Sequence, residues 1–138
     1  MTSWRLEFDN RAARQLLKLG SIDRKRIRDF LDGRVLTGDD PRQLGEALAA
    51  AQVVDRIIWT AIPLSMRDRC NGVKQSDSGL ANFLVGADEA DVAVVFSERE
   101  GGEVDVGMRS RLGLDVAQVA LKLGGGGHPR AAGCTLQA

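Results

Sequence analysis

Two strand-like segments joined by paired glycines constrain the fold of this chain most strongly. Residues 91–98, DVAVVFSE, form a nearly continuous apolar run, which is typical of a strand buried on both faces. After Gly101 and Gly102, the apolar residues Val104, Val106 and Met108 recur at every second position. Residues 91–110 are therefore predicted to form a β-hairpin, so the sheet that contains them has at least one antiparallel pair.

Helical and strand-like patterns alternate along the rest of the chain. Strands are predicted at residues 4–8, 56–63 and 133–138, and helices at 11–20, 22–36, 64–72, 78–87 and 114–124. Residues 37–46 are expected to be a loop, and residues 47–56 favour a helix. The order indicates an α/β (α+β) fold, with a mixed β-sheet of about five strands, helices packed on it and an added N-terminal β-α-α segment.

Composition excludes several classes of function. The 19 basic and 19 acidic residues balance, so no general attraction to nucleic acid or anionic membranes is expected. Cys70 and Cys134 lack metal-type spacing, which favours a reduced, cytoplasmic setting and leaves a disulfide unsupported. No apolar run approaches the roughly 20 residues that span a bilayer, and no signal peptide is evident.

A run of four glycines precedes the single histidine of the chain, in LKLGGGGHPRAAGC at residues 121–134. Glycines let several backbone N–H groups point to one side, which makes a nest for a phosphate. A helix-to-strand connector is the simpler alternative. The run lacks the P-loop and dinucleotide-binding patterns, and a lone histidine makes no zinc site. The candidate phosphate- or nucleotide-binding residues are Arg109, Ser110, Gly125, Gly126, Gly127, His128 and Arg130; no catalytic or metal-binding residue and no cofactor is predicted.

The segment GGGGHPRAAGCTL, with the upstream residues from about 52, resembles the DHH-associated C-terminal domain of RecJ-like exonucleases and oligoribonucleases. The resemblance implies that the glycine loop, His128 and an arginine hold the nucleotide and its phosphate. In that family a separate DHH domain holds two metal ions, usually manganese. This chain has no DHH triplet and no second histidine.

Residues 3–48 resemble instead the first strand and helical hairpin of RelE/ParE-type toxins, up to DDPRQLGEAL. The later toxin strands, which carry the residues that position messenger RNA, have no counterpart here. The basic residues at positions 24–28 fit a solvated helix face, with a nucleic-acid or ribosome contact as the alternative.

The two resemblances predict a boundary between residues 51 and 52, and the alternative is that both parts form one merged globular unit. The leading hypothesis is a recombined or designed, non-enzymatic chimera that keeps a weak phosphate- or nucleotide-binding loop. One alternative is the substrate-binding part of a DHH-type phosphoesterase that acts on short oligonucleotides. Another is a purely structural protein without a ligand. The exposed apolar faces of the N-terminal helices, at Leu16 and Ile27 among others, predict a homodimer.

Overall fold

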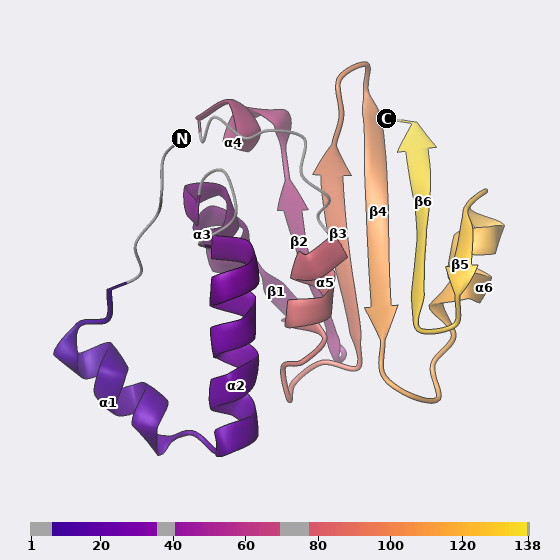
Figure 1. Cartoon of the computed structure of the whole chain (residues 1–138). Helices are drawn as coiled ribbons and strands as arrows, with labels where there is room; N and C mark the ends of the chain where they lie inside the picture. Colours follow the sequence, from indigo (N-terminus) through magenta and orange to yellow (C-terminus); the bar gives the residue numbers. More distant parts are fainter. Residues whose placement is uncertain (1–6, 36–40, 70–77, 138) are drawn as a thin grey trace. The chain divides into compact units, whose positions relative to one another are not determined.

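The computed structural model describes residues 7–35, 41–69 and 78–137 (Figure 1). The chain divides into two compact units, Met1–Pro41 and Arg42–Ala138. The division falls before the boundary expected from the sequence, because helix α3 (Pro41–Ala49) packs in the second unit. Ala47 is fully buried there, and the Thr60 hydroxyl donates a hydrogen bond of 2.5 Å to its carbonyl oxygen.

The first unit consists of α1 (Asn10–Lys18), α2 (Ser21–Phe30) and a π-helical turn, η1 (Leu31–Val35). The Asp9 carboxylate caps α1 by accepting from the Ala12 N–H at 2.7 Å. Neither α1 nor α2 contains a buried residue, and together they line a groove of about 730 Å³. Of the strand predicted at residues 4–8, residues 4–6 lie outside the described part, and residues 7–8 are not in a strand.

The second unit is built on one six-stranded sheet in the order β1-β2-β3-β4-β6-β5. Its strands are β1 (Gln52–Val54), β2 (Ile57–Ile62), β3 (Val92–Glu98), β4 (Glu103–Ser110), β5 (Gly126–His128) and β6 (Ala131–Gln137). Strands β2 and β3 are parallel and all other neighbours are antiparallel. The predicted mixed sheet and the β3–β4 hairpin are therefore confirmed.

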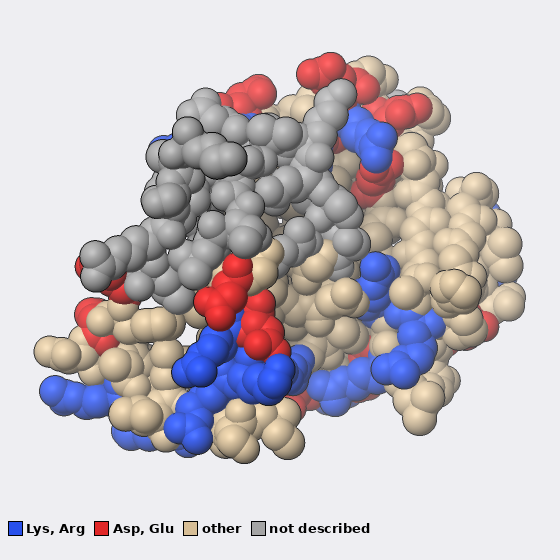
Figure 2. All heavy atoms as spheres, viewed as in Figure 1, with Lys and Arg blue, Asp and Glu red and all other residues tan. Residues whose placement is uncertain are grey.

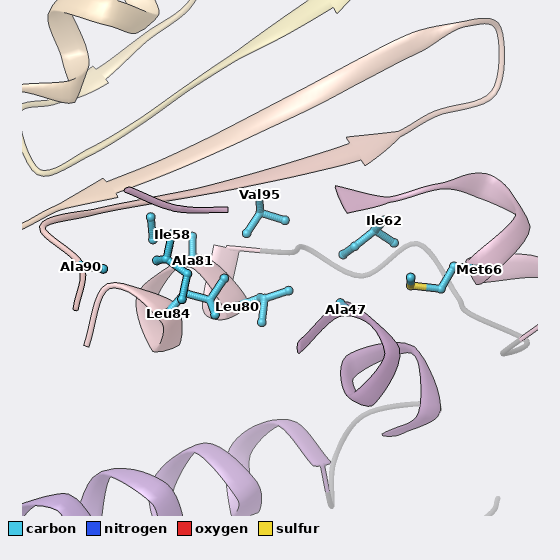
Figure 3. Close-up of a cluster of buried hydrophobic side chains, with 10 residues drawn as sticks. Ala47, Ile58, Ile62, Met66, Leu80, Ala81, Leu84, Ala90 and Val95 are labelled. Carbon is cyan, nitrogen blue, oxygen red and sulfur yellow. The ribbon is translucent and has the colours of Figure 1, made fainter. Parts of the chain in front are cut away.

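Helices pack on both faces of this sheet. On one face, Met66 of α4 (Leu64–Arg69) and Leu80 and Leu84 of α5 (Ser78–Leu84) join inward residues of β2 and β3 in a buried cluster, which Figure 3 shows. On the other face, α6 (Val116–Lys122) packs against alternate residues of β4 and β6. The strand predicted at β3 is confirmed, but only one of its faces is fully buried, because Val92, Val94 and Phe96 on the α6 face are partly buried.

The secondary structure differs from the prediction in the segment that leads into β2, which contains α3, β1 and the β1–β2 turn. Helix α3 begins at Pro41, inside the expected loop, and the expected helix at residues 47–56 ends early and gives way to β1. A two-residue turn then joins β1 to β2, with Asp55 (φ 47°) and Arg56 (φ 64°) in the left-handed region. Neither residue is the glycine or asparagine that usually marks such a turn, so the sequence carried no turn signal.

An ion pair holds this turn against the start of β3. The Arg56 guanidinium donates to both carboxylate oxygens of Asp91, at 2.6 and 2.8 Å, and also to the carbonyl oxygen of Asp88 at 3.2 Å. The hydrogen bond from Arg56 lowers the pKa of the Asp91 carboxyl below its ordinary value of 3.8. The left-handed backbone of Arg56 is therefore held by its own side chain.

Asp91→Asn is expected to destabilise the chain at neutral pH and to have little effect in strong acid. The folded-state pKa of Asp91 is lowered, so its stabilising contribution is present above the unfolded-state value and is lost as the pH falls through the folded-state value. Urea unfolding of both proteins between pH 7 and pH 2 measures this change. A difference in midpoint that stays constant over the whole range would contradict the ion-pair explanation.

Candidate functional site

Three cross-strand neighbours place two of the predicted basic residues together. Arg109 of β4 pairs with Ala131 of β6, which pairs in turn with His128 of β5. Directly paired residues on antiparallel strands share one face of the sheet, and neighbouring strands lie about 4.8 Å apart. Arg109 and His128 therefore lie in one row on the same face, separated by the small side chain of Ala131.

The basic side chains of this row and of the turn after β5 are available to a ligand. His128 and Arg130 are exposed, and within the described part of the chain neither side chain has a hydrogen-bond or ion-pair partner. Arg109 is half-buried and is fixed by Asn82 of α5, whose Oδ1 accepts from its Nε at 2.8 Å. Figure 2 shows basic side chains gathered around the end of β4.

Ser110 lies on the opposite face of the sheet from Arg109, because successive residues of a strand alternate sides. Its side chain is buried, with 4% exposure, and its Oγ lies 2.8 Å from the carbonyl oxygen of Leu114 and 3.1 Å from that of Pro129. The Ser110 hydroxyl thus joins the end of β4 to the segments before α6 and after β5. The structure does not bring it together with Arg109 and His128.

Close packing of β5 against β6 accounts for two of the four glycines. A Cβ atom on Gly125 would lie 2.6 Å from the Cβ of Cys134, and one on Gly127 would lie 2.6 Å from the carbonyl oxygen of Ala131. The Gly125 N–H donates to the carbonyl of Ala120 at 2.8 Å, at the end of α6, and so is not free for a phosphate. A Cβ on Gly126 would meet no atom within 4 Å, so the sheet stays open beside His128.

Asp105 and Glu103, the carboxylates on the same face of β4, are both engaged, Glu103 by the Gln137 amide at 3.0 Å. Asp105 lies four residues before Arg109, forms an ion pair with Arg99 and accepts a hydrogen bond of 2.9 Å from the Thr135 hydroxyl. Arg111, one residue beyond the end of β4, donates to the carbonyl oxygens of Val85 and Ala87, at 3.4 and 2.7 Å, and holds the α5–β3 connection. Among the described residues, no hydrogen bond or ion pair joins Arg109 or His128 to a carboxylate.

The described residues form no evident metal site and expose no reactive thiol. No group of three or more His, Cys, Asp or Glu side chains among them is arranged to hold a metal ion. Cys134 is buried in the cluster under α6, and burial, with the nearby Asp105 charge, raises the pKa of its thiol. Cys70 lies outside the described residues. No helix in residues 7–35, 41–69 or 78–137 is both long and apolar enough for a membrane span.

Comparison with known proteins identifies the family. The model of the DHHA1 domain matches residues 70–138, which is half of the chain. The chain belongs to the DHHA1 domain family. The match includes Arg109, the glycine run, His128 and Arg130, so the resemblance to the DHH-associated domain is confirmed.

Among curated proteins, the bifunctional oligoribonuclease and PAP phosphatase NrnA of Thermus thermophilus is 48% identical over 59 residues, which cover 43% of this chain and 17% of that protein. An exopolyphosphatase-related protein of Bacteroides fragilis has a similar structure, with a TM-score of 0.66, 15% identity, and coverage of 82% of this chain and 35% of that one. A pGpG-specific phosphodiesterase, PggH, of Vibrio cholerae gives a TM-score of 0.52, 11% identity and coverage of 91% and 40%. The chain thus spans well under half of each of these proteins.

The interpretation of the chain as a non-enzymatic chimera is wrong. The family match places a DHHA1 domain at residues 70–138, and the NrnA relative that matches this chain is an oligoribonuclease and PAP phosphatase. The two solved structures align with 82% and 91% of this chain, whereas the second unit is 97 of its 138 residues. The aligned part of the chain therefore includes residues of the first unit. The resemblance of residues 3–48 to RelE/ParE-type toxins is not supported.

Asn82 is the residue of this site that sequence reasoning missed. It lies in a short helix between the buried residues Ala81 and Leu84, and its position next to an arginine depends on how α5 docks on β3 and β4. A single asparagine on the exposed side of an amphipathic helix is ordinary, so the sequence held no signal for it.

Proposed function

We propose that this chain is the substrate-binding part of a DHH-type phosphoesterase that acts on short oligonucleotides. Arg109, His128 and Arg130 would bind phosphate oxygens at the end of the nucleotide. Gly126 would leave the sheet open for the ligand, while Gly125, Gly127 and Ser110 would hold β5 and its turn in place. Cleavage of the phosphate ester is assigned to the DHH domain of such enzymes, not to these residues. A cytoplasmic location and a homodimer stay predictions.

The row formed by Arg109, Ala131 and His128 carries this proposal. It sets two nitrogen-bearing side chains on one face, about two strand spacings apart, with only a methyl group between them. Guanidinium groups and imidazole N–H groups donate to phosphate oxygens, and the forked guanidinium matches their geometry. The exposed Arg130 side chain lies two residues from His128 in the β5–β6 turn and adds a second guanidinium charge to that of Arg109.

A 5′-phosphorylated dinucleotide such as pApA is expected to bind to the intact chain and to shift the His128 imidazole resonances. Arg109→Ala and His128→Ala should each weaken this binding. For Arg109 we expect a loss of about tenfold or more, because a hydrogen bond to a charged group contributes about 1.5–3 kcal/mol. Titration followed by NMR, with calorimetry for the affinity, measures both effects.

Lys122→Ala is the matched control, because it also removes one exposed positive charge, from the helix that covers the other face of the sheet. It should bind pApA as the parent chain does. Unchanged His128 resonances at millimolar pApA would reject the proposed function. Equal losses in Lys122→Ala and Arg109→Ala would show that only the overall charge matters.

A further inference from the structure

Arg109 is fixed at two of its three guanidinium nitrogens by uncharged oxygen atoms. Its Nε donates to Oδ1 of Asn82 at 2.8 Å, and its Nη1 donates to the carbonyl oxygen of Met108 at 2.8 Å. Its Nη2 has no partner within the described part of the chain. The guanidinium is therefore oriented by the protein but keeps its full charge for a ligand.

Other arginines of the same unit are held differently. Arg56 pairs with Asp91, Arg69 with Glu46 and Arg99 with Asp105, and in each pair the carboxylate neutralises the guanidinium charge. These ion pairs connect separate segments of the fold. Arg111, like Arg109, is held by uncharged oxygen atoms, but both of its partners are backbone carbonyls, whereas Arg109 also has a side-chain partner, Asn82.

The Nδ2 group of the Asn82 amide is available to donate a hydrogen bond to a ligand. An arginine nitrogen can only donate, so the Asn82 oxygen must face it, and the Nδ2 amide group is left for another acceptor. Within the described residues Nδ2 has no hydrogen-bond partner, and the Asn82 side chain is exposed. Its helix is rigidly seated, because Leu80, Ala81 and Leu84 on the other side of α5 are at most 4% exposed.

We infer that Asn82 is a positioning and specificity residue for the phosphate end of the ligand: it orients Arg109 without neutralising it and offers the Nδ2 amide as a further donor. This inference rests on the proposed function. The groups around the site donate hydrogen bonds and carry positive charge, so they favour an anion with several accepting oxygens. A terminal phosphate has that chemistry, whereas the bare 5′-hydroxyl of ApA does not.

The test compares Asn82→Asp with Asn82→Ala, both on an exposed side chain of the intact chain. An aspartate at this position can accept from Nε and Nη2 of Arg109 together and neutralise the guanidinium. Asn82→Asp should therefore weaken pApA binding by about tenfold or more, and Asn82→Ala by several-fold. Gln118→Glu, the same isosteric change on the exposed side of α6, is the matched control and should bind as the parent does.

The dependence of binding on salt separates this role from a structural one. Loss of one ligand-facing positive charge should reduce the slope of log affinity against log salt by about one in Asn82→Asp, while Asn82→Ala should keep the parent slope. The parent should also bind pApA more tightly than ApA, and Asn82→Asp should lose most of that preference. A merely structural asparagine would change the unfolding temperature but neither the slope nor the preference.

The possible outcomes are distinguishable. If Arg109→Ala weakens binding but both Asn82 variants bind pApA as the parent does, the inference is overturned and the proposed function stands. If Gln118→Glu weakens binding as much as Asn82→Asp, the effect is one of overall charge and the inference is likewise overturned. If Arg109→Ala and His128→Ala also bind as the parent does, the proposed function itself fails.

Discussion

Gly125→Val is expected to detach strand β5 from the edge of the sheet and to disorder the His128 side of the site. A side chain at this position would meet the carbonyl oxygen of Gly133 and the Cβ of Cys134, the latter at 2.6 Å from the first added carbon. Neither neighbour can move away easily, because both belong to β6, in the interior of the sheet. Overpacking costs about 1–3 kcal/mol even where a core can adjust, and here the contact includes backbone.

Chemical unfolding and the amide resonances of residues 126–128 measure this effect. Gly126→Ala, at the adjacent residue and the first of β5, is the control, because a Cβ there meets no atom within 4 Å. It should keep the β5 resonances and the unfolding midpoint close to those of the parent chain. If Gly125→Val kept the β5–β6 cross-peaks and the parent midpoint, close packing would not be the reason for glycine at position 125.

Leu84→Ala is expected to destabilise the second unit by about 2–5 kcal/mol, the cost typical of removing a buried leucine. Leu84 has 4% exposure and lies in the cluster between α5 and the sheet, beside Leu80 and Ile58 (Figure 3). The cavity left behind also loosens α5, the helix that carries Asn82. The affinity for pApA should therefore fall together with stability.

Urea unfolding gives the change in free energy, and the matched control is Leu121→Ala. Leu121 is 59% exposed on α6, so its truncation should change the free energy of unfolding by less than about 0.5 kcal/mol. A Leu84→Ala variant as stable as Leu121→Ala would contradict the assignment of α5 to the core. Loss of stability without loss of affinity would show that the docking of α5 does not position Arg109.

Much of the fold followed from local patterns. The apolar run of β3, the glycine pair after it and the alternation in β4 predict the central hairpin, because each signal lies within a few residues of the turn it specifies. The amphipathic pattern of α6 and its capping by Asp115 are equally local. Strands β1 and β5 have only three residues each and gain their hydrogen bonds from a neighbouring strand, so no sequence period revealed them.

Some features of the candidate site were also predictable from the sequence, and others depended on the structure. Arg109, His128 and the glycines are predicted from the sequence, because the segments that contain them resemble the family. Ser110 was grouped with Arg109 because the two are adjacent in the chain. The pleat of β4 separates them, since adjacent residues of a strand point to opposite faces.

The sequence by itself determined the class of fold, the central hairpin and the family, because these depend on residues close together in the chain. The tertiary structure decided which residues meet. Register across β4, β6 and β5 sets His128 beside Arg109, and the docking of α5 brings Asn82 to the same guanidinium from 27 residues away. Such contacts arise from strand pairing and helix packing over long chain separations, and no local pattern encodes them.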